Sequence, residues 1–227
     1  MKNKLNEYLN PLRYLKSRLK NSSSEIANKG VYLYRTLKKN GNKEKVFGIG
    51  MPKTGTTTLG AVLDTLGYRH YTYDMDLTVK VRKGDLTSLF RKIRHYDSFE
   101  DWPWHLVYKE LDKNYPEAKF ILTVRKSTNK YVDSLKKHHL RQGVAKPEFD
   151  KPYWWDGVFD FQPNEWDYDK AKHEYEKHNE DVMHHFKNRE DKLLIICWED
   201  GDEWSKICKF LNEKVPKKIF PHKNKSI

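Results

Sequence analysis

Apolar residues along this chain alternate between short runs typical of buried strands and longer stretches with a helical period. The runs at 46–50, 119–124 and 193–198 predict three strands. Apolar residues three or four positions apart predict helices at 56–66, from Asp85 to Ile93, and at about 104–114, 127–141, 167–188 and 202–212. Strands alternating with helices form a mainly parallel sheet covered on both faces. We therefore predict a three-layer α/β fold for residues 46–227.

The first 45 residues differ from the rest of the chain in charge. They hold 12 Lys and Arg against 3 Asp and Glu, whereas residues 46–227 are close to balanced at a net charge of +3. Asn10-Pro11 predicts the start of a short helix with an apolar stripe at Leu12, Leu15 and Leu19, and a weaker helix follows at 24–39. Two interpretations of this basic helical arm stay open: it packs on the domain or remains partly unstructured, or it docks on an anionic membrane surface or an acidic carrier.

Composition limits the location and the partners of the protein. A hydrophobic content of 37% and a mean hydropathy of −0.95 exclude a membrane-embedded body. The N-terminus lacks the apolar core of a secretory signal. Cys197 lies in an apolar strand pattern and Cys208 on an apolar helix face, which predicts buried thiols in a reducing compartment. We expect a cytoplasmic protein, peripheral to the inner face of a membrane if the arm docks there, and no nucleic-acid partner, because the body has no strong positive charge.

A loop rich in glycine and threonine joins the first predicted strand to the first helix of the domain, in the stretch VFGIGMPKTGTTTL at 46–59. This order aims backbone N–H groups and a helix N-terminus at an anion. The P-loop of an NTPase requires lysine directly after its last glycine. Here Gly50 and Gly55 have the P-loop separation, but Thr56 stands in place of that lysine and Lys53 precedes Gly55 by two residues. The loop is P-loop-like without the NTPase motif.

This loop resembles that of a known family. The run Pro52-Lys53-Thr54-Gly55-Thr56-Thr57-Thr58 is similar to the 5′-phosphosulfate loop of sulfotransferases that use 3′-phosphoadenosine 5′-phosphosulfate (PAPS). The strand pattern at 120–124 ends in Arg125, and Ser134 lies on the next predicted helix. In the family, an arginine and a serine so placed bind the 3′-phosphate. Most members have the serine eight residues after the arginine. In this chain Ser134 is nine residues on, so the helix starts one residue later or Ser127 contributes instead.

The resemblance runs from about residue 46 to 222 and implies a P-loop NTPase-like fold, PAPS as donor and 3′-phosphoadenosine 5′-phosphate (PAP) as product, with no metal. It gives Lys53 the role of neutralising the negative charge that develops when the sulfuryl group leaves. It implies that the 5′-phosphate is bound by the backbone amides at Gly55–Thr57, by the hydroxyls of Thr56 and Thr57, and by the helix N-terminus. The acceptor would be a hydroxyl or amine on a small molecule, a glycan or a lipid.

Such a transfer requires a general base. Many cytosolic members carry the motif K-x-H-x-P about twenty residues before the arginine, with its histidine as base. This chain has Phe99-Glu100-Asp101-Trp102-Pro103 there, which puts Asp101 24 residues before Arg125. We expect Asp101 to be the base, with a pKa raised by burial beside Trp102 and Trp104. Alternatively, Asp101 caps a helix that has Pro103 in its first turn. His105 is the second candidate and Glu100 the third.

Other features are less specific. Arg82-Lys83-Gly84 matches a motif that binds the 3′-phosphate in the family, but the family carries it near the C-terminus, so we interpret the match here as coincidence. Lysines of the tail are instead the candidates for part of the 3′-phosphate contact: Lys217, Lys218, Lys223 and Lys225. The pairs His138-His139 and His184-His185 are expected on helix surfaces. The long segment 143–167 is either a lid over the acceptor or a small satellite core, formed by its aromatic residues: Tyr153, Trp154, Trp155, Phe159, Phe161 and Trp166.

Two other classes of protein remain as alternatives. A P-loop nucleotide or small-molecule kinase would share the fold, although the loop lacks the NTPase lysine. A non-catalytic module would keep the nucleotide fold and act through its basic arm.

Overall fold

The computed structural model describes residues 43–142 and 168–222. The predictions made for the N-terminal arm up to residue 42, for the aromatic segment 143–167, and for Lys223 and Lys225 lie outside these residues.

Five parallel strands form the central sheet, in the order β2-β3-β1-β4-β5. The three predicted strands are confirmed as β1 (Val46–Gly48), β4 (Lys119–Val124) and β5 (Leu193–Cys197). The other two were not predicted: β2 (His70–Tyr71) and β3 (Ser98–Phe99). Each has only two residues, so neither produces an apolar run that a sequence pattern can reveal.

Alternate residues of the strands enter two separate apolar cores, one on each face of the sheet. Phe47, Phe120 and Leu122 belong to the first core, and Val46, Ile121 and Ile196 belong to the second. Two core residues on different strands, Phe47 and Phe120, have ring centroids 5.6 Å apart. The cores follow from the two-residue period of a strand, which sends successive side chains to opposite faces.

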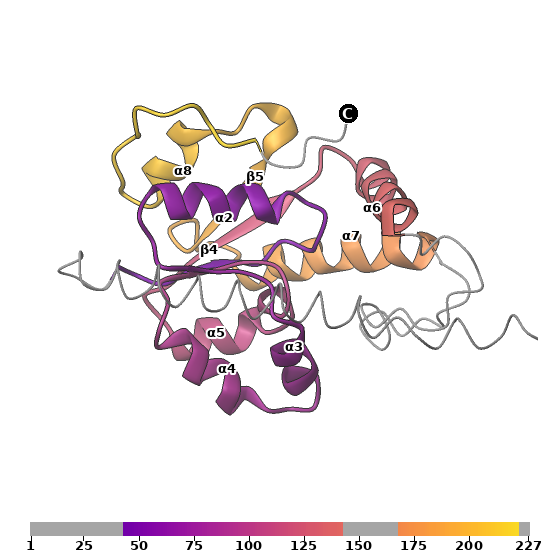
Figure 1. Cartoon of the computed structure of the whole chain (residues 1–227), viewed down its shortest axis with the longest axis horizontal. Helices are drawn as coiled ribbons and strands as arrows, with labels where there is room; N and C mark the ends of the chain where they lie inside the picture. The colour runs from indigo at the N-terminus through magenta and orange to yellow at the C-terminus, as the bar shows by residue number, and fades with distance from the viewer. Residues whose placement is uncertain (1–42, 143–167, 223–227) are drawn as a thin grey trace, which may run out of the picture. The chain divides into compact units, whose positions relative to one another are not determined.

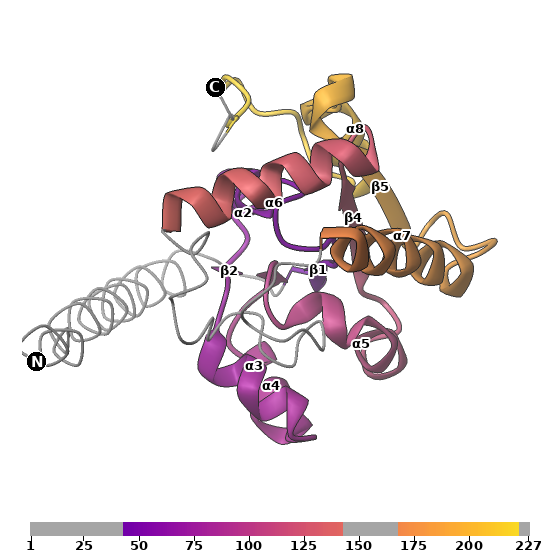
Figure 2. The same ribbon diagram turned by 90° about the vertical axis from the view of Figure 1, so that its right-hand side faces the viewer.

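Helices cover both faces, which confirms the three-layer α/β fold (Figure 1). The first face packs against α3 (Met75–Arg82), α4 (Leu86–Ile93), α5 (Tyr108–Asn114) and the C-terminal half of α7 (Tyr168–His185). The second face packs against α2 (Thr56–Thr65) and α8 (Trp204–Phe210). The remaining helix, α6 (Thr128–Gln142), lies beside α7 (Figure 2).

Several local predictions are confirmed and one is refined. Asp85 caps α4, because its carboxylate accepts a hydrogen bond from the Ser88 amide at 3.1 Å. The predicted helix at 104–114 is two pieces, a 3₁₀ turn at Trp104–Leu106 and then α5. Cys197 and Cys208 are both free, buried thiols.

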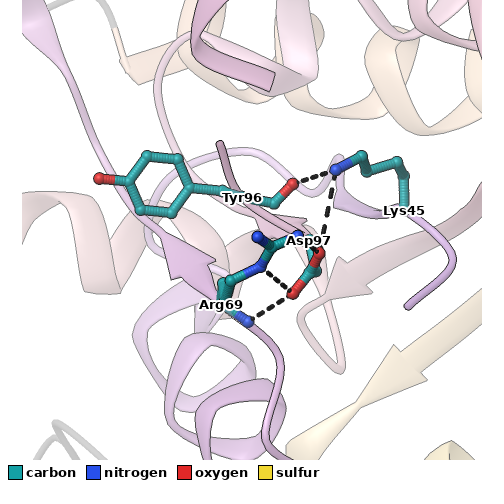
Figure 3. Close-up of polar contacts among 4 residues, drawn as sticks. All are labelled: Lys45, Arg69, Tyr96 and Asp97. Atoms are coloured by element: carbon teal, nitrogen blue, oxygen red, sulfur yellow. Dashed lines mark hydrogen bonds and ion pairs between the residues drawn. The ribbon is translucent and has the colours of Figure 1, made fainter. Parts of the chain in front are cut away.

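The amino ends of β1, β2 and β3 are joined by a buried ion cluster (Figure 3). The Asp97 carboxylate, 2% exposed, accepts from the Arg69 side chain at 2.7 Å and from the Arg69 backbone amide at 3.0 Å. The Lys45 ammonium lies 3.9 Å from Asp97 and donates to the Tyr96 carbonyl. Burial lowers the pKa of Lys45, although the charge of Asp97 opposes this shift. The cluster fixes one edge of the sheet, and the opposite edge carries the predicted site residues.

Candidate functional site at the carboxyl edge of the sheet

The candidate residues follow the carboxyl ends of four neighbouring strands. The loop with Lys53 comes after β1, Asp101 after β3, Arg125 after β4, and the turn Trp198–Asp200 after β5. Ligands of parallel α/β proteins bind at this edge of the sheet. The fold therefore places residues from distant parts of the sequence at one site.

The loop after β1 is anchored to the sheet through Thr54. Its hydroxyl donates to the Met51 carbonyl at 2.6 Å and lies 2.6 Å from the Thr123 hydroxyl of β4. Thr54 and Thr123 are both fully buried. Thr54 thus holds the shape of the loop, a role that the sequence pattern did not distinguish from contact with a ligand.

Gly55 allows the sharp turn from this loop into α2. Its φ of 95° lies in the left-handed region, and a β-carbon there would come within 2.4 Å of Trp198 Cδ1. The Trp198 indole N–H donates to the Gly55 carbonyl at 3.1 Å. The first turn of α2 contains no acidic residue. Because the first amides of a helix have no intrahelical acceptor, those at Thr56 and Thr57 are available to an anion, which the helix dipole favours.

Asp101 lies against the start of α2. Its carboxylate accepts from the Thr56 hydroxyl at 3.0 Å and from the Trp102 amide at 2.9 Å. Burial raises the pKa of Asp101 to about 7, and the charge of Glu100 adds to this rise. The hydrogen bonds from Thr56 and Trp102 and the charge of Lys53 oppose it. The expected rise in pKa is therefore confirmed, and it gives a carboxylate suited to accept a proton near neutral pH.

The side chain of Asp101 does not cap the following turn. That 3₁₀ turn begins at Trp104 with no side-chain cap, and only the backbone carbonyl of Asp101 accepts from the Trp104 amide, at 3.0 Å. Asp101 has a φ of 70°, and Lys53, on the facing loop, has a φ of 74°. Both residues thus hold left-handed backbone conformations, which residues other than glycine seldom adopt, and such conformations are concentrated at functional sites.

His105, the second candidate for the base, lies behind Asp101 and is 3% exposed. Its Nδ1 is 3.4 Å from the Asp101 carbonyl, and its ring lies 4.2 Å from that of Trp102. Burial lowers the pKa of His105 to about 3, and the neighbouring His178 adds to this effect. His178 in turn contacts the Ile49 carbonyl at 2.7 Å. His105 is therefore a neutral, enclosed group at working pH.

Arg125 is fixed on two sides. Its backbone amide donates to the Tyr175 hydroxyl at 2.9 Å, and its Nη1 donates to Glu199 at 3.0 Å. The other oxygen of Glu199 accepts from the Lys126 amide at 2.7 Å. Within the part of the chain that the structure describes, the buried Nε of Arg125 has no hydrogen-bond partner. One donor of the guanidinium thus remains to be satisfied.

The two candidate serines differ in position. Ser127 accepts from the Lys130 amide at 3.3 Å and so caps α6, which begins at residue 128, one residue later than predicted. Ser134 lies on α6 and is 5% exposed, next to the buried Leu135. Ser134 lies on the helix and Ser127 directly precedes it, so the choice between the two arrangements that the nine-residue spacing allowed stays a prediction.

Sequence reasoning missed five residues that support these groups: Thr123, Tyr175, His178, Trp198 and Glu199. Trp198 and Glu199 directly follow a predicted strand, and that position in a parallel sheet was an available signal. Tyr175 and His178 are three residues apart on α7, and this spacing marks one helix face.

The remaining sequence features lie elsewhere on the surface. Arg82, Lys83 and Gly84 are exposed at the end of α3, and Lys217 and Lys218 are exposed in the tail. His185 pairs with Asp112 at 2.8 Å. Across residues 43–142 and 168–222, no group of three or more His, Cys, Asp or Glu is placed to hold a metal ion. None of the helices described there is long and apolar enough to span a membrane.

The fold and this edge define an α/β protein with a loop rich in glycine and threonine after β1 and a carboxylate beside it. Residues 45–227 match the family model described as a sulfotransferase domain. The chain therefore belongs to the sulfotransferase family.

Two individual proteins are similar to this chain. Ava biosynthesis cluster protein M of Aspergillus versicolor is 27% identical over 211 residues, which cover 78% of this chain and 80% of that protein. The crystal structure of a sulfotransferase from Alicyclobacillus acidocaldarius superposes with a TM-score of 0.52 at 16% identity, over 82% of this chain and 86% of that one. The similarity to this crystal structure supports the P-loop-like α/β fold.

Proposed function

We propose that the protein transfers a sulfuryl group from PAPS to a hydroxyl or amine of a small molecule, with Asp101 as general base. The observation that carries this proposal is the hydrogen bond of 3.0 Å from Thr56 to Asp101, with the charge of Lys53 acting on the same carboxylate. It brings the loop that resembles a phosphosulfate site into direct contact with a group that can take a proton.

The residues present suit a nucleotide with phosphate groups at two ends. The first turn of α2 offers backbone amides to a phosphate and contains no acidic side chain that would repel it. Arg125 offers the buried Nε that has no partner among the described residues, and Ser134 lies on the helix that follows. We assign the 5′-phosphosulfate to residues 52–58 and the 3′-phosphate to Arg125 and Ser134. The bound donor supplies the sulfuryl group.

Lys53 and Asp101 have separate roles in such a transfer. Lys53 places a positive charge where negative charge develops, and preorganised charge of this kind is usually a large part of rate enhancement. Asp101 takes the proton of the acceptor at Oδ1 or Oδ2. We favour Asp101 over His105 because His105 is enclosed and has its Nδ1 against a backbone carbonyl, whereas Asp101 is partly exposed. Glu100 is 2% exposed and thus has less access to an acceptor than Asp101.

We further propose a small, hydroxyl-bearing acceptor with an apolar body. Tyr73 is partly exposed, packs on the apolar cluster that contains Met51 and Trp102, and feels the charge of Asp101, so its ring offers an apolar surface beside the proposed base. The name of the Aspergillus relative refers to a biosynthesis cluster, which agrees with a small molecule better than with a glycan or a lipid.

The donor is tested first, by thermal unfolding of the full chain with PAP and, separately, with ATP and magnesium. A ligand at one hundred times its Kd adds about 2.7 kcal/mol to stability, so PAP should raise the unfolding temperature and ATP should not. Stabilisation by ATP alone would favour the kinase alternative. Radiolabelled PAPS offered with panels of phenols, alcohols, amines, glycans and lipids then identifies the acceptor, and transfer to none of them would favour a non-catalytic module.

A further inference from the structure

The turn Trp198–Asp200, which follows β5, contacts two separate parts of the candidate site. The Trp198 indole N–H donates to the Gly55 carbonyl at 3.1 Å, at the start of α2. The next residue, Glu199, accepts a hydrogen bond from the Arg125 guanidinium, after β4. One short turn thus connects the proposed 5′-phosphosulfate loop to the proposed ligand of the 3′-phosphate.

Glu199 uses its two oxygens for different partners. Its Oε1 accepts from Arg125 Nη1 at 3.0 Å, and its Oε2 accepts from the Lys126 backbone amide at 2.7 Å. The bond to the amide ties the carboxylate to the backbone of the residue next to Arg125. The bond to Nη1 then fixes one end of the guanidinium relative to that backbone. The side chains of Arg125 and Glu199 are 19% and 30% exposed, so water competes only in part for these bonds.

The turn that carries Glu199 is itself held by contacts on both sides. The Trp198 ring packs on the buried Phe220, with ring centroids 5.3 Å apart. The Asp202 carboxylate accepts from the Cys197 backbone amide at 2.9 Å and so closes the turn. These contacts place the backbone of Glu199 before any ligand binds, as a residue that orients another side chain requires.

The contact with Glu199 leaves a different edge of the Arg125 guanidinium for a ligand. Nη1 lies on the far side from the Nε–H, whereas the Nε–H and one N–H of Nη2 are parallel and suit two oxygens of a phosphate. Within residues 43–142 and 168–222, the buried Nε has no hydrogen-bond partner, and a buried donor without an acceptor is costly. A phosphate at this edge need not displace Glu199.

We propose that Glu199 is a positioning residue: it holds Arg125 with the Nε edge directed at the 3′-phosphate and so gives the protein its preference for nucleotides that carry this phosphate. The inference rests on the proposed assignment of the 3′-phosphate to Arg125. The Tyr175 hydroxyl accepts from the Arg125 amide at 2.9 Å and fixes the backbone, so the remaining freedom lies in the side chain. A side chain that is ordered before the ligand arrives loses less entropy on binding, which raises the affinity.

Two nucleotides that differ only in the 3′-phosphate test this role. Titration calorimetry of the full chain with PAP and with adenosine 5′-phosphate gives two dissociation constants, and their ratio measures the preference for the 3′-phosphate. Glu199→Ala should reduce this preference roughly tenfold, about the value of one hydrogen bond, through weaker binding of PAP alone. A merely structural role would change both constants together.

Conservative variants separate the reach of Glu199 from its charge. Glu199→Gln keeps an oxygen that can accept from Nη1 and should retain most of the preference. Glu199→Asp keeps the charge but is one methylene shorter, so it cannot reach both donors and should lose the preference as Glu199→Ala does. Asp200→Ala is the matched control and should leave the preference unchanged, because it removes a 50% exposed carboxylate of the same turn that pairs with the Lys126 ammonium at 3.2 Å.

A double variant shows whether Glu199 acts through Arg125. In the Arg125→Ala background, Glu199→Ala should cause no further loss of preference, because the side chain that it orients is already absent. A further loss there would overturn the proposal.

The remaining outcomes are equally decisive. An unchanged preference in Glu199→Ala and Glu199→Asp would overturn the proposal, and so would tighter PAP binding in Glu199→Ala, because Glu199 would then compete with the phosphate. A loss in Glu199→Gln with none in Glu199→Asp would overturn it in favour of a charge effect. If Glu199→Ala does not fold, Glu199→Asp decides. A wild-type protein without preference for PAP would instead contradict the proposed 3′-phosphate site itself, and this inference with it.

Discussion

The Thr56 hydroxyl donates a hydrogen bond to the Asp101 carboxylate over 3.0 Å. Thr56 is the first residue of α2 and Asp101 follows β3, so the bond joins two segments that are 45 residues apart in the chain. It fixes one carboxylate oxygen at the helix N-terminus, where an anion is favoured. The proposed base and the proposed donor site are therefore one connected unit, and changes in either should affect the other.

Lys53→Ala should reduce sulfuryl transfer by about 10²–10³-fold, as is usual when one preorganised donor to developing charge is removed. The fold should persist, because Lys53 is partly exposed and lies on a loop. Turnover with radiolabelled PAPS measures the loss, and circular dichroism checks the fold. Lys83→Ala, an exposed lysine at the end of α3, is the matched control and should retain activity. More than about a tenth of wild-type turnover in Lys53→Ala would contradict the assignment.

Asp101 should produce an acid limb in the pH dependence of transfer. Only the deprotonated carboxylate accepts a proton, so the rate should fall about tenfold per unit as pH drops below about 7. The limb should be lost in Asp101→Asn together with most of the activity. A limb that persists unchanged in the residual activity of this variant would assign the base to another residue.

The same raised pKa predicts an effect on stability with a definite sign. Between pH 4 and 7 the folded chain holds a proton on Asp101 that the unfolded chain has released, so this residue stabilises the fold less as pH rises. Asp101→Asn removes this dependence and should raise the unfolding temperature, relative to wild type, by a few degrees more at pH 8 than at pH 4. Scanning calorimetry at both pH values measures the difference. An equal shift at both would show that the pKa of Asp101 is not raised by folding.

Arg125→Ala should weaken PAP binding by roughly 10–100-fold, since it removes a charge-assisted hydrogen bond to the 3′-phosphate. Adenosine 5′-phosphosulfate lacks that phosphate, and its affinity should change little. Titration calorimetry with both ligands gives the comparison. Lys126→Ala is the neighbouring control, because the Lys126 side chain is 65% exposed and its ammonium pairs with Asp200. Equal losses for both ligands in Arg125→Ala would make Arg125 a structural residue.

Gly55→Ala should destabilise the domain more than Gly84→Ala does. Both glycines have positive φ, at 95° and 84°, so both substitutions cost about 1 kcal/mol of backbone strain. Only at Gly55 would the new β-carbon also meet Trp198, whereas Gly84 has open space around it. Urea unfolding should show an extra loss of about 1–3 kcal/mol at Gly55. Equal losses would mean that the Trp198 ring moves aside freely.

The sequence by itself determined the order of the long elements and the position of the loop rich in glycine and threonine between the first strand and the first helix of the domain. The apolar pattern of a run such as 119–124 predicts a buried strand from local sequence alone, and the structure has a strand there. The spacing of Gly50, Lys53 and Gly55 is likewise a local property that can be read without the tertiary structure. The sequence also identified Asp101 as the candidate general base, from its position in the segment 99–103.

Only the tertiary structure decided which candidates meet and in what state. The contacts Thr56–Asp101, Thr54–Thr123 and Arg125–Glu199 each join segments at least 45 residues apart, so no local pattern encodes them. The strands β2 and β3 were missed because two residues are too few to show a period. The charge states of Asp101 and His105 depend on how far each is withdrawn from water and on which charges lie beside it. Burial and charge proximity are properties of the packed chain, because folding creates the surroundings that shift a pKa.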